Sequence, residues 1–101
     1  MNDYAELMRR HRRIAILRFL QDSPAYTSNV SILSNVLNSD AIGVTSSRTQ
    51  IAEELAWLGE RRLVKLGDNA DFLVATATAD GLDVAAGIAT HEGVQRPGPR
   101  R

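Results

Sequence analysis

The chain contains no cysteine and only two histidines, His11 and His91. Disulfide bonds and thiolate metal sites are therefore excluded, and two histidines leave no basis for a multi-histidine metal site. A chain without cysteine is typical of the reducing cytoplasm, where we expect this protein to be located. We also expect it to need no metal and no other cofactor.

Long hydrophobic runs are missing as well. No apolar run approaches the roughly 18 residues that a membrane helix needs, and residues 1–4 lack the basic region and apolar stretch of a signal peptide. We therefore expect no association with a membrane. The sequence also lacks a nucleophile–base pair, a phosphate-binding loop and a carboxylate pair, so we expect no enzymatic activity.

Charge is balanced over the whole chain but not along it. The 101 residues, enough for one domain with a hydrophobic core, have a formal net charge of zero. Residues 1–18 carry five arginines against two acids, and residues 96–101 carry three arginines and no acid. Residues 19–95 carry four bases against ten acids. An acidic middle thus lies between two basic ends, a pattern that bears on partners rather than on fold.

Helical periodicity predicts a first helix over residues 3–21, beginning with a capping-box-like Asp3 and Glu6. Its apolar residues fall on one stripe at helical spacing, and Arg9, Arg12 and Arg13 lie away from this stripe. The stripe consists of Tyr4, Leu7, Met8, Ile14 and Ala15.

Two further helices are predicted over residues 28–38 and 45–61. The third helix has an inward stripe formed by Ile51, Leu55 and Leu58, which recur at helical spacing. After it the pattern becomes β-prone.

Residues 63–66 and 72–76 predict a β-hairpin, and a last helix is expected over residues 79–89. The glycine, proline and arginine residues that follow predict a flexible basic tail. We therefore assign residues 1–89 to one domain and residues 90–101 to the tail.

This order predicts a mainly α-helical protein with a small β-hairpin, the layout of a winged helix-turn-helix. Such a protein has a three-helix core, a two-stranded wing and here a C-terminal helix. Motifs along most of the chain carry a family resemblance. They are Tyr4-Ala5-Glu6-Leu7, Arg12-Arg13-Ile14-Ala15-Ile16-Leu17, Leu55-Ala56-Trp57-Leu58, Gly81-Leu82-Asp83-Val84-Ala85-Ala86-Gly87 and Arg96-Pro97. With them the chain resembles the small winged-helix proteins of Mu-like phages and prophages, which are loosely grouped with ArsR-type transcriptional regulators. The resemblance implies the winged-helix fold.

Two features depart from that pattern. ArsR-type repressors sense metals through cysteines and through histidine and carboxylate clusters, and this chain has no cysteine. Many winged helices place a glycine between the third helix and the wing, where this chain has Arg61 and Arg62. We therefore expect either backbone strain or a different kind of turn at this position.

The third helix and the first supply the candidate DNA contacts. Serine, threonine, glutamine and arginine at the start of a recognition helix suit phosphate and base-edge contacts. Arginines on the first helix could neutralise phosphates. The candidates are Ser46, Arg48, Thr49, Gln50, Arg12 and Arg13. Carboxylates oppose this role, because Glu53 and Glu60 share the face of the third helix and Asp68 and Asp71 lie at the hairpin tip.

The first and last helices are the candidate dimer interface. A helix of about 19 residues is roughly 28 Å long, which exceeds what a small three-helix core covers. The residues expected at the interface are Tyr4, Leu7, Met8, Leu82, Ala85 and Ala86. Trp57 lies off the inward stripe of its helix and is expected to cover either the hairpin or a partner subunit.

Two functions remain open from the sequence. The first is a dimeric phage or prophage transcriptional regulator that binds double-stranded DNA and has no evident small-molecule effector. The alternative is a winged-helix module for protein–protein interaction, in which the acidic middle and Trp57 meet a phage or host protein.

Overall fold

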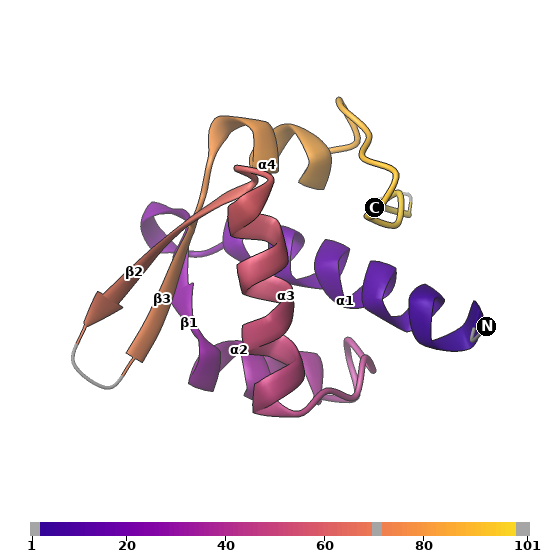
Figure 1. Cartoon of the computed structure of the whole chain (residues 1–101), viewed down its shortest axis with the longest axis horizontal. Coiled ribbons are helices and arrows are strands. Elements are labelled where there is room, and N and C mark those ends of the chain that lie inside the picture. The colour runs from indigo at the N-terminus through magenta and orange to yellow at the C-terminus, as the bar shows by residue number, and fades with distance from the viewer. Residues whose placement is uncertain (1–2, 70–71, 99–101) are drawn as a thin grey trace.

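The computed structural model describes residues 3–69 and 72–98, which form a mainly helical fold with a small antiparallel sheet (Figure 1). The elements in chain order are helix α1 (Asp3–Gln21), the 3-10 turn η1 (Pro24–Tyr26), strand β1 (Thr27–Asn29), helix α2 (Val30–Leu37), helix α3 (Arg48–Glu60), strands β2 (Val64–Asn69) and β3 (Phe72–Ala77), and helix α4 (Ala79–Ala85). In the described part of the chain, no helix has both the length and the apolar character needed to cross a membrane.

Side-chain caps mark where three of the helices begin. The Asn29 side chain accepts a hydrogen bond from the backbone N–H of Ile32 at the start of α2. Ser47 and Gln50 form a complete capping box on α3. Thr78 accepts the N–H of Gly81 at the start of α4. These caps satisfy backbone donors that have no partner inside the helix, and they fix the start of each helix in the sequence.

The hairpin predicted after the third helix is present as β2 and β3, which pair antiparallel from Val64↔Ala77 to Asn69↔Phe72. The sheet has a third strand, β1, which pairs with β3 so that the order is β1-β3-β2. The hydroxyls of Thr27 and Thr76 lie 2.9 Å apart across this pair. A strand of three residues is too short to show a period, and the helix predicted over residues 28–38 therefore includes Ser28 and Asn29, which belong to β1.

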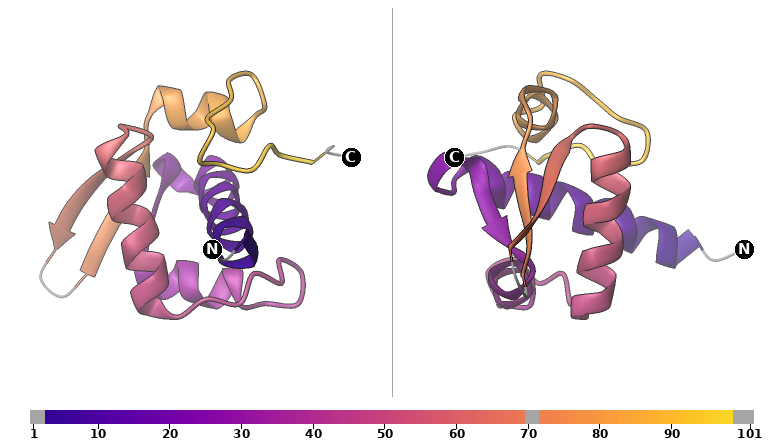
Figure 2. Two further views of the ribbon diagram at one scale, coloured as in Figure 1. Left: turned by 45° about the vertical axis from the view of Figure 1, so that its right-hand side comes forward. Right: turned by 60° about the vertical axis from the view of Figure 1, so that its left-hand side comes forward.

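The core lies between α1, α2, α3 and the inner face of the sheet. The side chains that are fully buried there are Ile16, Leu17, Leu20, Leu33, Leu37, Ile51, Leu55 and Leu58. The inward stripe predicted for the third helix is therefore confirmed. In the N-terminal half of the first helix the core does not cover the apolar stripe, as expected from the length of this helix: Tyr4 is 70% and Leu7 is 45% exposed. That half of α1 projects beyond the other helices (Figure 2).

The turn between α3 and β2 is a Schellman motif with arginine in place of glycine. Leu63 N–H donates to the carbonyl of Leu58, and Arg62 N–H donates to that of Gly59. Arg62 has a φ of 60°, in the left-handed region that L-residues rarely adopt. Of the two expected alternatives, the structure keeps the usual turn and has the backbone strain at Arg62.

The chain does not become a free tail after the last helix. α4 ends at Ala85, and Gly87, with a φ of 79°, turns the chain back. Val94 then inserts into the core and is 6% exposed, while the backbone N–H of Gln95 donates to the carbonyl of Arg10 at 3.3 Å. The boundary predicted at residue 89 is therefore wrong, because the segment behind it contributes to the core. Residues 99–101 of the predicted tail lie outside the described residues.

Candidate nucleic-acid interface

Helix α3 lies at the front of the fold, with the hairpin on one side and the N-terminal half of α1 on the other (Figure 1). Ile51, Leu55 and Leu58 point into the core, so residues at the opposite helical positions face solvent. These are Thr49, Glu53, Ala56 and Glu60, all exposed. None of these four is basic and two are carboxylates, so this face repels phosphate over most of its length.

The first turn of α3 keeps two of the predicted contacts accessible. Arg48 and Thr49 are exposed, and the Arg48 guanidinium donates a long hydrogen bond of 3.5 Å to the hydroxyl of Ser31. Gln50 is exposed too, but its side-chain oxygen Oε1 accepts the backbone N–H of Ser47 at 2.8 Å in the capping box. Only the side-chain NH2 group of Gln50 is therefore left for its predicted contact with a base.

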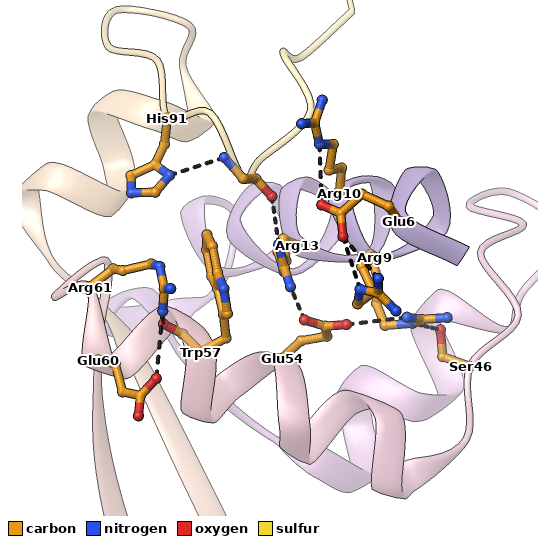
Figure 3. A network of polar contacts seen from close by, with 12 residues as sticks. Glu6, Arg9, Arg10, Arg13, Ser46, Glu54, Trp57, Glu60, Arg61 and His91 are labelled. Atoms are coloured by element: carbon orange, nitrogen blue, oxygen red, sulfur yellow. Dashed lines mark hydrogen bonds and ion pairs between the residues drawn. The ribbon is translucent and has the colours of Figure 1, made fainter. Parts of the chain in front are cut away.

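The other three predicted DNA contacts are buried in an ionic cluster between α1 and α3 (Figure 3). Arg12 donates to the hydroxyl of Ser46 at 2.6 Å and to the Glu54 carboxylate at 3.2 Å. Arg13 donates to the other oxygen of Glu54 at 2.8 Å and to the carbonyl of Gly93 at 2.8 Å. Both arginines and Ser46 are only 5% exposed. The prediction that Arg12, Arg13 and Ser46 face DNA is therefore wrong, because Glu54 on the inner face of α3 draws both guanidinium groups inward.

Trp57 lies between two guanidinium groups on the α1 side of α3 (Figure 3). The Cζ atoms of Arg13 and Arg61 each lie 3.8 Å from the centre of its ring system, a cation–π geometry. The ring of His91 meets it nearly at a right angle, with centroids 5.3 Å apart. A Cβ atom at Gly93 would collide with the indole. Trp57 thus packs against the C-terminal segment. The prediction that it covers the hairpin is wrong.

Three charged side chains on the outer face of α1 form a local triplet. The Glu6 carboxylate accepts hydrogen bonds from Arg9 at 2.9 Å and from Arg10 at 3.4 Å. The side-chain hydrogen bond from Arg9 lowers the pKa of Glu6 below its ordinary value. Arg9 and Arg10 together outweigh this one carboxylate, so the triplet keeps a net positive charge.

The residues predicted at a dimer interface fall into two groups. Tyr4, Leu7 and Ala86 are exposed, and Met8 and Leu82 are half-buried. Ala85, in contrast, is 1% exposed because it packs in the core of its own chain, and its predicted place at the interface is therefore wrong.

Two hollows border α3. One, of about 430 Å³, lies between the first half of α1 and the first turns of α3, and it is lined by Met8, Arg9, Gln50 and Glu53 among others. The other, of about 690 Å³, lies between the C-terminal half of α3 and β2, where the apolar surface comes from residues such as Ala56, Val64 and Leu66. The described residues contain no group of three His, Asp or Glu side chains placed to hold a metal ion.

A comparison with known proteins shows to which family the chain belongs. The chain is 40% identical over 95 residues to the uncharacterized protein gp26 of Escherichia phage Mu. The match covers 94% of this chain and 96% of gp26. The chain belongs to the gp26 family. The predicted relationship to Mu-like phage proteins is thereby confirmed. No protein-family model and no solved structure matches the chain.

Sequence reasoning missed two parts of this gp26-family site. Glu54 lies between Ile51 and Leu55, on the inward stripe of α3, and this position was the available signal that it needs a buried cationic partner. The docking of Gly93 on Trp57 left no such signal, because a glycine in a segment rich in glycine and proline is typical of a flexible tail.

Proposed function

We propose that this gp26-family protein is a winged-helix DNA-binding protein and acts as a phage transcriptional regulator. The observation that carries the proposal is the order α1-β1-α2-α3-β2-β3 combined with the sheet order β1-β3-β2. In this arrangement α3 follows α2 after the connection of residues 38–47 and stands beside a two-stranded wing, as the recognition helix of a winged helix does.

The first turn of α3 supports contact with DNA. Arg48 and Thr49 are exposed there, and they are side chains of the kind that bind phosphate oxygens and base edges. Glu53 and Glu60 restrict such contacts along the rest of the helix. The proposal therefore implies weak, salt-sensitive binding with limited readout of sequence.

Fluorescence anisotropy with random and genomic duplexes tests this proposal. Arg48→Ala should weaken binding to all duplexes and reduce the slope of log K against log[salt] by about 0.9, the value for one lost phosphate contact. Arg18→Ala, at a half-buried arginine near the far end of α1, removes the same charge and should leave the slope unchanged. Equal effects of the two variants would exclude α3 as the binding element.

We infer further that the protein acts as a homodimer. The exposed Tyr4 and Leu7 on the projecting half of α1 support a second copy at this place, since a two-fold axis would bury both side chains on both subunits. Sedimentation at tens of micromolar should then give about twice the monomer mass of 11.1 kDa. A monomer that still binds DNA would restrict the proposal to a monomeric regulator.

A second candidate function is a module for protein–protein interaction. It is favoured by the apolar hollow between α3 and β2, where Leu66 is exposed beside the small residues Ala56 and Gly59. An acidic helix face next to an apolar groove suits a protein partner better than a nucleic acid. A folded protein that binds no duplex at low salt would favour this function.

A further inference from the structure

Strand β2 is an edge of the sheet. The strand order β1-β3-β2 gives it β3 as its single neighbour in the described part of the chain. The backbone N–H of Thr78 donates to the carbonyl of Leu63 at 3.1 Å. These two residues continue the register of the β2–β3 pair by one step, so they form a hydrogen-bonded pair of the antiparallel ladder. Along such a ladder, hydrogen-bonded and non-hydrogen-bonded pairs alternate.

The alternation shows which backbone groups of β2 point to the free edge. Lys65 pairs with Thr76 in the hydrogen-bonded manner, whereas Leu66 directs its N–H and C=O away from β3. The other side of β3 agrees with this assignment. Because Thr76 turns its backbone groups towards β2, its pair with Thr27 is non-hydrogen-bonded, the kind in which side chains lie closer together, and their hydroxyls are 2.9 Å apart. The backbone of Leu66 is therefore open to a further strand.

This free edge borders the hollow of about 690 Å³ between α3 and β2. Among the described residues, those that line the hollow come from α3, from β2 and from the turns next to them, and none comes from β3. Its apolar surface is formed by residues such as Ala56, Val64 and Leu66, of which Leu66 is 36% exposed. A Cβ atom at Gly59 would lie 3.1 Å from Cδ1 of Leu66, so glycine keeps the helix side of the hollow open. The edge thus faces an apolar space.

The end of the edge near α3 is positively charged. Arg62 and Lys65 are exposed and line the hollow, and the one acid that lines it, Glu60, pairs with Arg61 at 3.5 Å. Two other acids lie outside this lining. Asp80 is in the first turn of α4. Asp68 comes three residues after Lys65, about 10 Å further along the strand. An occupant of the hollow therefore meets basic side chains at the end near α3.

We propose that the free edge of β2 binds an extended segment of a partner protein, which adds to the sheet as a strand. The segment has apolar residues at alternate positions, which enter the hollow, and an acidic side chain beside Lys65. This inference rests on the second candidate function, the module for protein–protein interaction. The backbone groups favour a peptide over a nucleic acid, because the phosphate backbone has only acceptors and cannot pair with the exposed carbonyl of Leu66.

A synthetic peptide tests strand addition. The probe is a capped, fluorescently labelled heptapeptide in which valine alternates with glutamate, titrated against the full chain up to about 1 mM. Two controls keep all side chains but carry N-methyl groups, one on the valine nitrogens and the other on the glutamate nitrogens. Each blocks one of the two edges of the peptide strand. We expect one control to lose binding and the other to bind as the parent peptide does.

Amide hydrogen exchange followed by NMR locates the bound peptide. The N–H of Leu66 points to the free edge, and it should exchange about tenfold more slowly at a peptide concentration of about ten times the Kd. The N–H of Lys65 is the internal control, because it already pairs with Thr76 and should keep its exchange rate. Equal slowing of both would indicate a general stabilisation of the fold and would contradict strand addition.

A charge reversal tests the acidic side chain of the segment. Lys65→Glu should weaken binding of the valine–glutamate peptide by roughly two- to fivefold, the size expected for an exposed ion pair, and should favour a peptide with lysine in place of glutamate. Arg96→Glu is the matched control, because Arg96 is exposed, does not line the hollow and undergoes the same change of charge. A circular dichroism melt checks that both variants are folded. Equal effects of the two variants would contradict the contact with Lys65.

The remaining outcomes separate the inference from the function on which it rests. If both N-methylated peptides bind as tightly as the parent, the hollow accepts a peptide without strand addition, and the inference is wrong while the second candidate function stands. If the folded protein binds no peptide at about 1 mM, the inference is wrong. If, in addition, a random duplex shifts the NMR signals of Leu66 and Lys65, the hollow is a nucleic-acid surface, and the second candidate function is wrong as well.

Discussion

Arg13 and Glu54, 41 positions apart in the sequence, form a buried ion pair with 2.8 Å between Nε and Oε1. Arg12 binds the other oxygen of the same carboxylate, so one acid on α3 holds two arginines on α1. Arg13 also donates to the carbonyl of Gly93, and through it α3, α1 and the C-terminal strap (residues 91–95) are joined at one point. The cluster thus fixes α1 and the C-terminal strap against α3.

Removing the shared carboxylate should strongly destabilise the fold. Glu54→Gln leaves two buried guanidinium groups without a counter-charge, and we expect a loss of about 3–5 kcal/mol in the free energy of unfolding. Urea denaturation followed by circular dichroism measures it. Glu53→Gln is the matched control, because its side chain is exposed one residue earlier and should change stability by less than about 0.5 kcal/mol. Similar losses for both variants would contradict the role given to Glu54.

A methyl group at Gly93 should loosen the strap. Gly93→Ala brings a Cβ atom into the Trp57 ring, and overpacking of this kind costs about 1–3 kcal/mol. We expect a red shift of the tryptophan fluorescence as the ring becomes more exposed. Gly98→Ala is the control, since no heavy atom lies within 4 Å of the position its Cβ would take. An unchanged spectrum and melting curve for Gly93→Ala would show that the strap does not pack as described.

Glu54 and Gly93 show what could and what could not be predicted from the sequence. The helices, the hairpin and the inward stripe of α3 follow from periodicity, which reflects the geometry of each element alone. Arginine is rarely buried, so the sequence alone predicts Arg12 and Arg13 on the outside of the helix as phosphate contacts, and only the position of Glu54 in space shows that they are buried. The strap depends on contacts between residues about 80 apart, such as Arg13 with Gly93, and no local pattern reports them.

Glycine at position 62 should stabilise the protein. Arg62 adopts a left-handed conformation that is costly for an L-residue, and Arg62→Gly removes this strain at the expense of some backbone entropy. We expect a gain of about 0.5–1 kcal/mol in thermal or urea denaturation. Arg61→Gly, at the preceding residue with a negative φ, should instead destabilise the protein. A loss of stability in Arg62→Gly would contradict the strain argument.

The pKa of Glu6 offers a pH-dependent test of the charge triplet on α1. Because hydrogen bonding to Arg9 lowers this pKa in the folded state, the interaction stabilises α1 above the unfolded pKa. The stabilisation is lost as the pH falls through the lower, folded-state pKa. An NMR titration of the Glu6 carboxyl should show the lowered pKa, and Arg9→Ala should raise it towards its ordinary value. An unchanged pKa in that variant would exclude the Arg9 contact in solution.

The most direct test of the account is the binding of the wild-type protein to a random duplex at two salt concentrations. With four to five phosphates neutralised, the binding constant should fall by roughly 150- to 500-fold between about 50 and 200 mM salt. We predict detectable anisotropy change at the lower concentration and this steep loss at the higher one. A folded protein that gives no anisotropy change at about 50 mM salt, or a binding constant that does not depend on salt, would contradict the account.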